Sequence, residues 1–142
     1  MHMITLETAR KIADAAMADA QKRNIAKWSV VVTDQGGNIR IAMRADASGN
    51  FGVDIARGKA LSALGFNLSS LKLAQNFGAS PSFTAAINAA TGGGFVPLGG
   101  GVVVVNAAAV IIGAAAFAGA MPEVDDEIIT AAVRSAGLAV PA

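Results

Sequence analysis

Apolar residues recur along the chain with two different spacings, one typical of helices and one typical of strands. The first helical run is preceded by Thr5, a suitable N-cap, and followed by Asn24, a suitable residue beyond a helix end. This pattern predicts a helix over residues 6–23. Its apolar positions are Leu6, Ala9, Ile12, Ala13, Ala16, Met17 and Ala20.

The next segment has the pattern of a β-hairpin. Residues 28–33 form an apolar, β-branched run, and residues 39–44 alternate between apolar and polar side chains. Between them, Asp34-Gln35-Gly36-Gly37-Asn38 is turn chemistry, because glycine adopts positive φ without strain. A loop over residues 45–52 follows the hairpin.

The second half of the chain alternates short helices with apolar strands. We expect a helix over residues 53–64 that ends at Gly65. We also expect a short helix that Ser69 or Ser70 caps and that runs to about Phe77. The remaining expected elements are a helix from Ser80-Pro81-Ser82 to about Ala90, an extended segment at 95–98, strands at 102–106 and 110–117, and a last helix from Pro122.

This order, α-ββ-ααα-βββ-α, predicts an α+β fold in one domain over residues 1–142. Hairpins in place of βαβ repeats indicate an antiparallel sheet, here of about five strands, flanked by helices.

Charge is distributed unevenly along the chain. No ionisable side chain lies between Lys72 and Glu123. The apolar stretch 101–121 has the length of a membrane helix. However, its glycines, Asn106 and the β-branched run at 102–105 favour two buried strands that turn at Asn106-Ala107. Strands this apolar need cover on both faces, so we predict a homo-oligomer and no membrane association.

Composition excludes several classes of function. The net charge is +1 with no basic run, so no nucleic-acid surface is expected. Cysteine is absent and His2 is the sole histidine, which leaves no Ser-His-Asp triad and no metal cluster. The first residues lack the features of a secretory signal, so we expect a cytoplasmic protein.

Lys59 and Asp125 are the candidate catalytic residues. Lys59 lies among apolar neighbours in the helix at 53–64, and a partly buried lysine can act as a base or bind an anion. Asp125 lies in the acidic first turn of the last helix and can meet Lys59 or Arg44 across a subunit boundary. A carboxylate beside a lysine is suited to acid–base chemistry and is equally common as a structural pair.

The candidate ligand-binding groups are cationic, aromatic, acidic and glycine residues. Two arginines on one strand face can clamp a carboxylate, aromatic rings can line a pocket for a flat ligand, and glycine-rich turns can offer N–H groups to an anion. Each group also has a purely structural interpretation: surface charge for the arginines, core packing for the aromatic rings and tight turns for the glycines. These candidates are Arg40, Arg44, Lys59, Phe51, Phe66, Gly100 and Glu123.

Haem iron is usually held by His, Cys, Met or Tyr. Tyr is absent as well as Cys, and His2 lies at a terminus. Met43 and Met121 are expected to fill the core.

An ordered set of motifs resembles the GlcG-like family of haem-degrading domains, which includes HbpS-like and PduO C-terminal-like proteins. Ala116 and Ala118 stand where the family pattern has Gly and Ser, so one hydroxyl is missing. The motifs are Val31–Asn38 with Arg44-Ala45-Asp46, Ala56–Ala63, Val96–Val102, Gly113-Ala114 and Gly119–Asp125.

The resemblance implies a small α/β unit that assembles into oligomers and binds haem or another flat acidic ligand near a subunit interface. No cofactor is assigned from the residues themselves. Two alternatives stay open: a cofactor-free catabolic enzyme, an isomerase, lyase or hydrolase acting on a small carboxylate, and a purely structural oligomer subunit.

Overall fold

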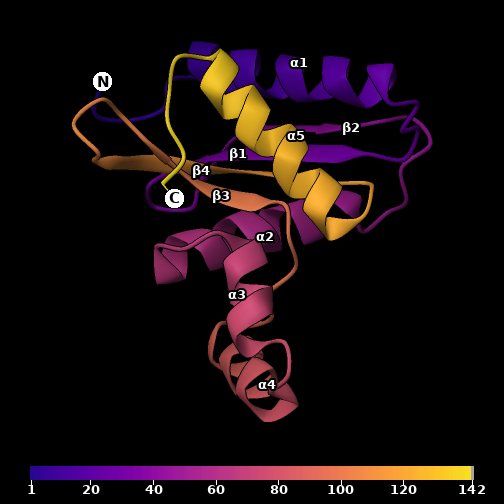
Figure 1. Cartoon of the computed structure of the whole chain (residues 1–142), viewed down its shortest axis with the longest axis vertical. Coiled ribbons are helices and arrows are strands. Elements are labelled where there is room, and N and C mark those ends of the chain that lie inside the picture. The colour runs from indigo at the N-terminus through magenta and orange to yellow at the C-terminus, as the bar shows by residue number, and fades with distance from the viewer. Residues whose placement is uncertain (142) are drawn as a thin grey trace.

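A computed structural model describes residues 1–141 as five helices and a four-stranded antiparallel sheet (Figure 1). The strand order is β2-β1-β4-β3. Helices α1 and α5 cover one face of the sheet and α2 covers the other, so the α+β fold expected from the sequence is confirmed. The elements are α1 (Leu6–Lys22), β1 (Ser29–Asp34), β2 (Ile39–Arg44), α2 (Gly52–Phe66), α3 (Ser70–Phe77), α4 (Pro81–Ala90), β3 (Gly101–Val105), β4 (Ile111–Ala118) and α5 (Pro122–Ser135).

Helix α1 begins at the expected residue and ends at Lys22, one residue before the expected end. The Thr5 hydroxyl accepts a hydrogen bond from the backbone N–H of Thr8 at 3.1 Å, which satisfies one of the free N–H groups of the first turn. Asn24 follows the last turn with φ of 57°, the left-handed conformation that asparagine tolerates.

The two central strands, β1 and β4, are buried on both faces. Val30 lies opposite Phe117 and faces α1 and α5, while Val31 lies opposite Ala116 and faces α2. The small side chains of Ala114, Ala116 and Ala118 allow α2 to pack closely on the sheet.

The number of strands differs from the expectation of about five. Residues 95–98 form no strand, because side chains of neighbouring helices bind the backbone groups of Phe95 and Val96. The Ser62 hydroxyl accepts from the Val96 N–H at 2.7 Å, and the Asn88 amide donates to the Phe95 carbonyl at 2.8 Å. Pro97 has no N–H to offer to a neighbouring strand.

The end of α2 also differs from the expectation. Gly65 lies inside the helix, which continues to Phe66 and ends with Asn67 at φ of 51°. Asparagine therefore supplies the left-handed residue that ends this helix, a role that glycine usually fills.

The apolar stretch after residue 100 forms the hairpin of β3 and β4, as expected. The side chain of Asn106 closes its turn by accepting hydrogen bonds from the N–H groups of Ala108 and Val110, each at 3.0 Å. Among residues 1–141, no helix combines the length and the apolar character that crossing a bilayer requires.

Helices α3 and α4 form an arm that extends away from the layers of the sheet (Figure 1). No residue of α4 is buried. Aromatic contacts hold the arm together. Phe77 and Phe83 stack with their ring centroids 4.3 Å apart, and the tilted rings of Phe66 and Phe95, which lie just outside the arm in the sequence, are 5.5 Å apart. We call residues 70–94 the α3–α4 arm.

Candidate functional site

Lys59 and Asp125 form a buried ion pair within one chain. The Lys59 ammonium lies 3.0 Å from Oδ2 of Asp125 and donates a second hydrogen bond to the Phe117 carbonyl at 3.1 Å. Oδ1 of Asp125 accepts from the Ala120 N–H at 2.8 Å. The side chains of the pair are only 4% and 3% exposed, so nearly all their polar contacts are internal.

The pair connects the two helical layers around the end of the sheet. Lys59 comes from α2 on one face and Asp125 from the first turn of α5, which packs on the other. The glycines before β3 make room for this contact. A Cβ on Gly100 would lie 2.8 Å from the Asp125 Cβ and 3.0 Å from the Lys59 ammonium, and Gly100 itself has φ of 122°. The ligand candidate Gly100 thus lies against the pair.

Burial dominates the electrostatics of Asp125. Loss of water raises the pKa of its carboxyl above the ordinary value, against the opposing effects of the Lys59 charge and the backbone N–H groups. Neither Lys59 nor Asp125 lines any of the principal cavities formed by residues 1–141. The arrangement holds two charges together and offers a substrate no direct access to them.

The two arginines of β2 lie in different surroundings. Arg44 is exposed and lines a cavity between α1 and the end of β2. Arg40 is half-buried, and its guanidinium reaches the sulfur of Met3 at 3.6 Å. Arg40 lines none of the principal cavities of the described chain.

The cavity beside Arg44, which we call the α1–β2 pocket, has a volume of about 380 Å³. Its wall combines one cation, one carboxylate, two thioethers and an indole ring. Trp28 is only 7% exposed and stacks on Phe117 with the two rings 15° from parallel, so this part of the wall is fixed. The lining residues are Met17, Gln21, Trp28, Met43, Arg44, Ala45 and Asp46.

The other ligand candidates are dispersed. Phe51 is 73% exposed and lines a separate cavity at the start of α2, together with Lys27 and Ile55. Phe66 belongs to the aromatic cluster of the arm. Glu123 is exposed in the first turn of α5.

The residues considered as haem ligands also lie apart from one another. His2 is exposed near the N-terminus. Met43 packs against the main core while it lines the α1–β2 pocket. Met121 is 68% exposed, so the expectation that it fills the core is wrong. Its position before α5 leaves it outside the core, because Pro122 starts the helix immediately after it.

The α1–β2 pocket was not predictable from the sequence. Met17 belongs to the apolar stripe of α1, and nothing in that stripe distinguishes it from a core residue. Met17 and Met43 line the same cavity only because α1 packs across β2.

The fold is a twisted antiparallel sheet with helices on both faces and an aromatic arm, and this defines a class of small α+β domains. The chain belongs to the HbpS-like family of haem-degrading proteins, since the model of that family, described as "Haem degrading protein HbpS-like", matches residues 4–134. No curated protein sequence matches the chain.

Solved structures support this assignment. A double mutant of Streptomyces reticuli HbpS is 29% identical, with a TM-score of 0.79 over 95% of this chain and 88% of that chain. Klebsiella pneumoniae protein ORFY is 25% identical, with a TM-score of 0.86 over 96% and 92%. The PduOC:haem complex has a TM-score of 0.86 over 99% of both chains, but at 18% identity it shows the fold alone.

Proposed function

We propose that this protein binds haem, or a similar flat acidic ligand, in the α1–β2 pocket. The observation that carries the proposal is the chemistry of the pocket wall: two thioethers, an indole ring and a cation surround one cavity. Membership of a haem-degrading family and the fold shared with a haem complex support the same ligand class.

The residues of the pocket fit the requirements of haem. Methionine is one of the usual axial ligands of haem iron, and Met17 and Met43 both line this cavity. His2, the one residue of another usual ligand type in the chain, is exposed and lies outside the principal cavities. When bound, haem would supply an iron centre for redox chemistry or for binding a small gas.

The other groups of the pocket suit the rest of the ligand. The fixed indole of Trp28 offers an apolar, aromatic wall against which a porphyrin can pack. Arg44 forms no ion pair with any residue in 1–141, which leaves its guanidinium available to a propionate. All these residues come from one chain, so binding does not require the subunit interface expected from the sequence.

Haem titration with substitution of the thioethers tests the proposal. The expected result is a Soret band with one haem per chain, and loss or displacement of that band in the double variant Met17→Leu/Met43→Leu. Met121→Leu is the matched control, because this exposed methionine lies outside the pocket. A flat titration rejects haem binding, and an unchanged spectrum in the double variant rejects the α1–β2 pocket as the site.

We infer that Lys59 and Asp125 stabilise the fold and do not transfer protons. Their near-complete burial and their absence from the cavity walls support this choice over the cofactor-free enzyme. A turnover activity that is lost in Asp125→Asn would contradict this inference, provided that circular dichroism shows the variant to be folded.

We also propose that copies of this chain associate through the α3–α4 arm. Helix α4 has no buried residue, and an isolated helix of ten residues is marginal in water. The outer face of the arm carries no charge beyond Lys72, because the stretch from Leu73 to Pro122 contains no ionisable residue. A second copy presents an equally uncharged face, so neither partner has to desolvate a charge.

Light scattering after size exclusion tests this assembly. The variant Ala85→Glu/Ala89→Glu places two charges on the exposed face of α4, and we expect it to reduce the molar mass to that of one chain. Ala131→Glu on the exposed face of α5 is the control and should leave assembly unchanged. A wild-type protein that is monomeric, or an assembly that survives both charges, contradicts the proposal.

A further inference from the structure

The outer edge of β3 presents three residues whose backbone groups point away from β4. The Phe117 N–H donates a hydrogen bond to the Gly100 carbonyl at 2.8 Å, and this bond determines which residues of β3 point their backbone groups toward β4 and which point them outward. In an antiparallel ladder every second residue then bonds to the neighbouring strand, and the residues between them face outward. Gly101, Val103 and Val105 are therefore the outward-facing residues.

The first and last of these residues have partners within the chain. The Gly101 N–H donates to the Ser70 hydroxyl at 2.7 Å, and that hydroxyl lies 3.3 Å from the Gly101 carbonyl. Val105 and Ala139 exchange both of their backbone hydrogen bonds, at 2.9 and 3.1 Å. A side chain of α3 and the C-terminal segment thus cover the two ends of the edge.

Val103, between them, has no such partner among residues 1–141. No backbone group or side chain within hydrogen-bond distance pairs with its outward N–H or carbonyl. The residue is nevertheless only 2% exposed. Buried backbone groups are almost always hydrogen-bonded to protein or to ordered water, so this pair of groups needs a partner.

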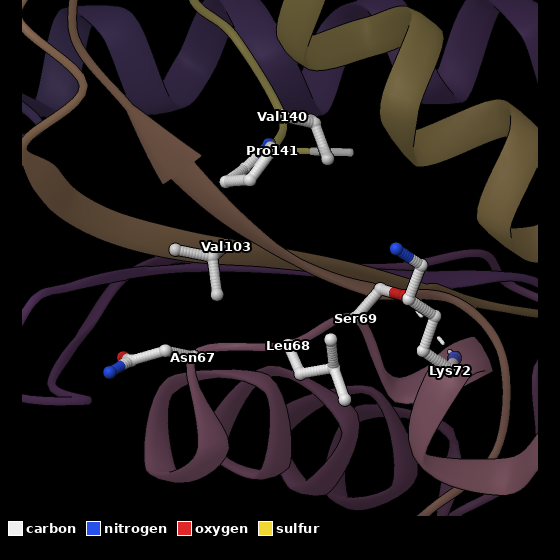
Figure 2. Close-up of a pocket in the computed structure, with 7 residues that line it drawn as sticks. All are labelled: Asn67, Leu68, Ser69, Lys72, Val103, Val140 and Pro141. Atoms are coloured by element: carbon white, nitrogen blue, oxygen red, sulfur yellow. Dashed lines mark hydrogen bonds between the residues drawn. The ribbon is translucent and has the colours of Figure 1, made fainter. Parts of the chain in front are cut away.

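A small cavity adjoins Val103 (Figure 2). In Figure 2, Val103 lies between the Asn67–Ser69 turn on one side and Val140 and Pro141 on the other. The cavity has a volume of about 20 Å³. About 10–15 Å³ is enough for one water molecule, whereas a peptide segment or an organic ligand needs far more space.

We propose that this cavity is a built site for a single ordered water molecule that hydrogen-bonds to the backbone of Val103. The water completes a row of three unlike partners along the edge: the Ser70 hydroxyl, the water, and the backbone of Ala139. Gly101 and Val105 already have partners, and with this water no outward-facing residue of the edge remains free, so a strand of another copy cannot pair with β3. Association of subunits must consequently use other surfaces.

Water–amide cross-relaxation in a ¹⁵N-labelled sample tests the site. We expect the Val103 amide to show a cross-peak to water. The sign of this cross-peak should be the one produced by a water molecule that stays bound for more than a nanosecond. The Val105 amide is the matched control, because it lies on the same edge and donates to Ala139. A Val103 amide without a cross-peak, or one with the sign of freely diffusing water, overturns the proposal.

Two further measurements separate water from other sources of the signal. Lys72 also lines the cavity, and its ammonium protons exchange with water, so the cross-peak must persist in Lys72→Met. Loss of the cross-peak in this variant would assign it to the ammonium and reject the water. An intermolecular contact to Val103 in a sample of mixed labelling would show that a second copy fills the edge, which also contradicts the proposal.

Discussion

Replacing Lys59 by methionine isolates the energetics of the buried pair. The substitution keeps much of the side-chain volume and leaves the Asp125 carboxylate, only 3% exposed, without its ionic partner. Removing one member of a buried ion pair typically costs about 3–5 kcal/mol. For a chain of 142 residues this corresponds to a Tm lower by roughly 10–17 °C.

Adding the second substitution, Asp125→Asn, should recover most of the lost unfolding free energy. In Lys59→Met/Asp125→Asn no charge stays buried, and the Asn carbonyl can still accept from the Ala120 N–H. We expect the double variant to recover at least about 2 kcal/mol relative to Lys59→Met alone. Urea unfolding of the wild type, both single variants and the double variant measures this cycle.

The pH dependence gives an independent check with a definite sign. Burial already raises the pKa of Asp125 in the folded protein, and removal of the Lys59 charge raises it further. A group with a raised folded pKa lowers stability as the pH rises through that pKa. The deficit of Lys59→Met should therefore be largest at pH 7 and should shrink as the pH falls toward 4.

A surface lysine provides the control. Lys11 and Glu7 lie 3.8 Å apart with side chains 65% and 83% exposed, so Lys11→Met should change stability by less than about 1 kcal/mol. A Lys59→Met variant whose unfolding free energy lies within about 1 kcal/mol of the wild type would contradict a stabilising role of the pair. A double variant as unstable as Lys59→Met would contradict it as well.

Two further predictions concern residues around the same core. Gly100→Ala should lower the urea midpoint, because its Cβ would clash with the Phe117 carbonyl. Gly65→Ala points into open space within α2 and should raise stability by up to about 1 kcal/mol. Equal effects of the two substitutions would contradict this. Burial raises the pKa of Asp126, whose Oδ1 has no hydrogen-bond partner among residues 1–141, so this group lowers stability as the pH rises through its folded pKa. Asp126→Asn should consequently stabilise the protein at pH 7 and flatten its unfolding free energy between pH 4 and 7, and a loss of stability at pH 7 would show that the carboxylate has a partner.

Much of the fold was predictable from local patterns. The hairpin of β1 and β2, the caps of α1, and the reading of the stretch after residue 100 as two buried strands all depend on periodicity and turn residues. The segment expected to be extended at 95–98 does not add a fifth strand to the sheet, because Ser62 and Asn88, which lie elsewhere in the sequence, bind the backbone of Val96 and Phe95. Competition of this kind for backbone groups leaves no trace in the local pattern.

The candidate site was predictable only in part. The sequence identified Lys59, Asp125, Arg44 and Met43 as residues of interest. It did not indicate that Lys59 and Asp125 are inaccessible, or that Met17 and Met43 line the same cavity. Burial depends on which helix covers which face of the sheet, and this is decided by packing of the whole domain.

The sequence by itself determined the class of fold, the order of the elements and the uncharged character of the second half, because these follow from side-chain periodicity and composition. Only the tertiary structure decided which polar groups become isolated from water and which open into a cavity. The physical reason is that solvation of a charge or a backbone amide depends on all the atoms around it, and most of those atoms come from distant parts of the chain.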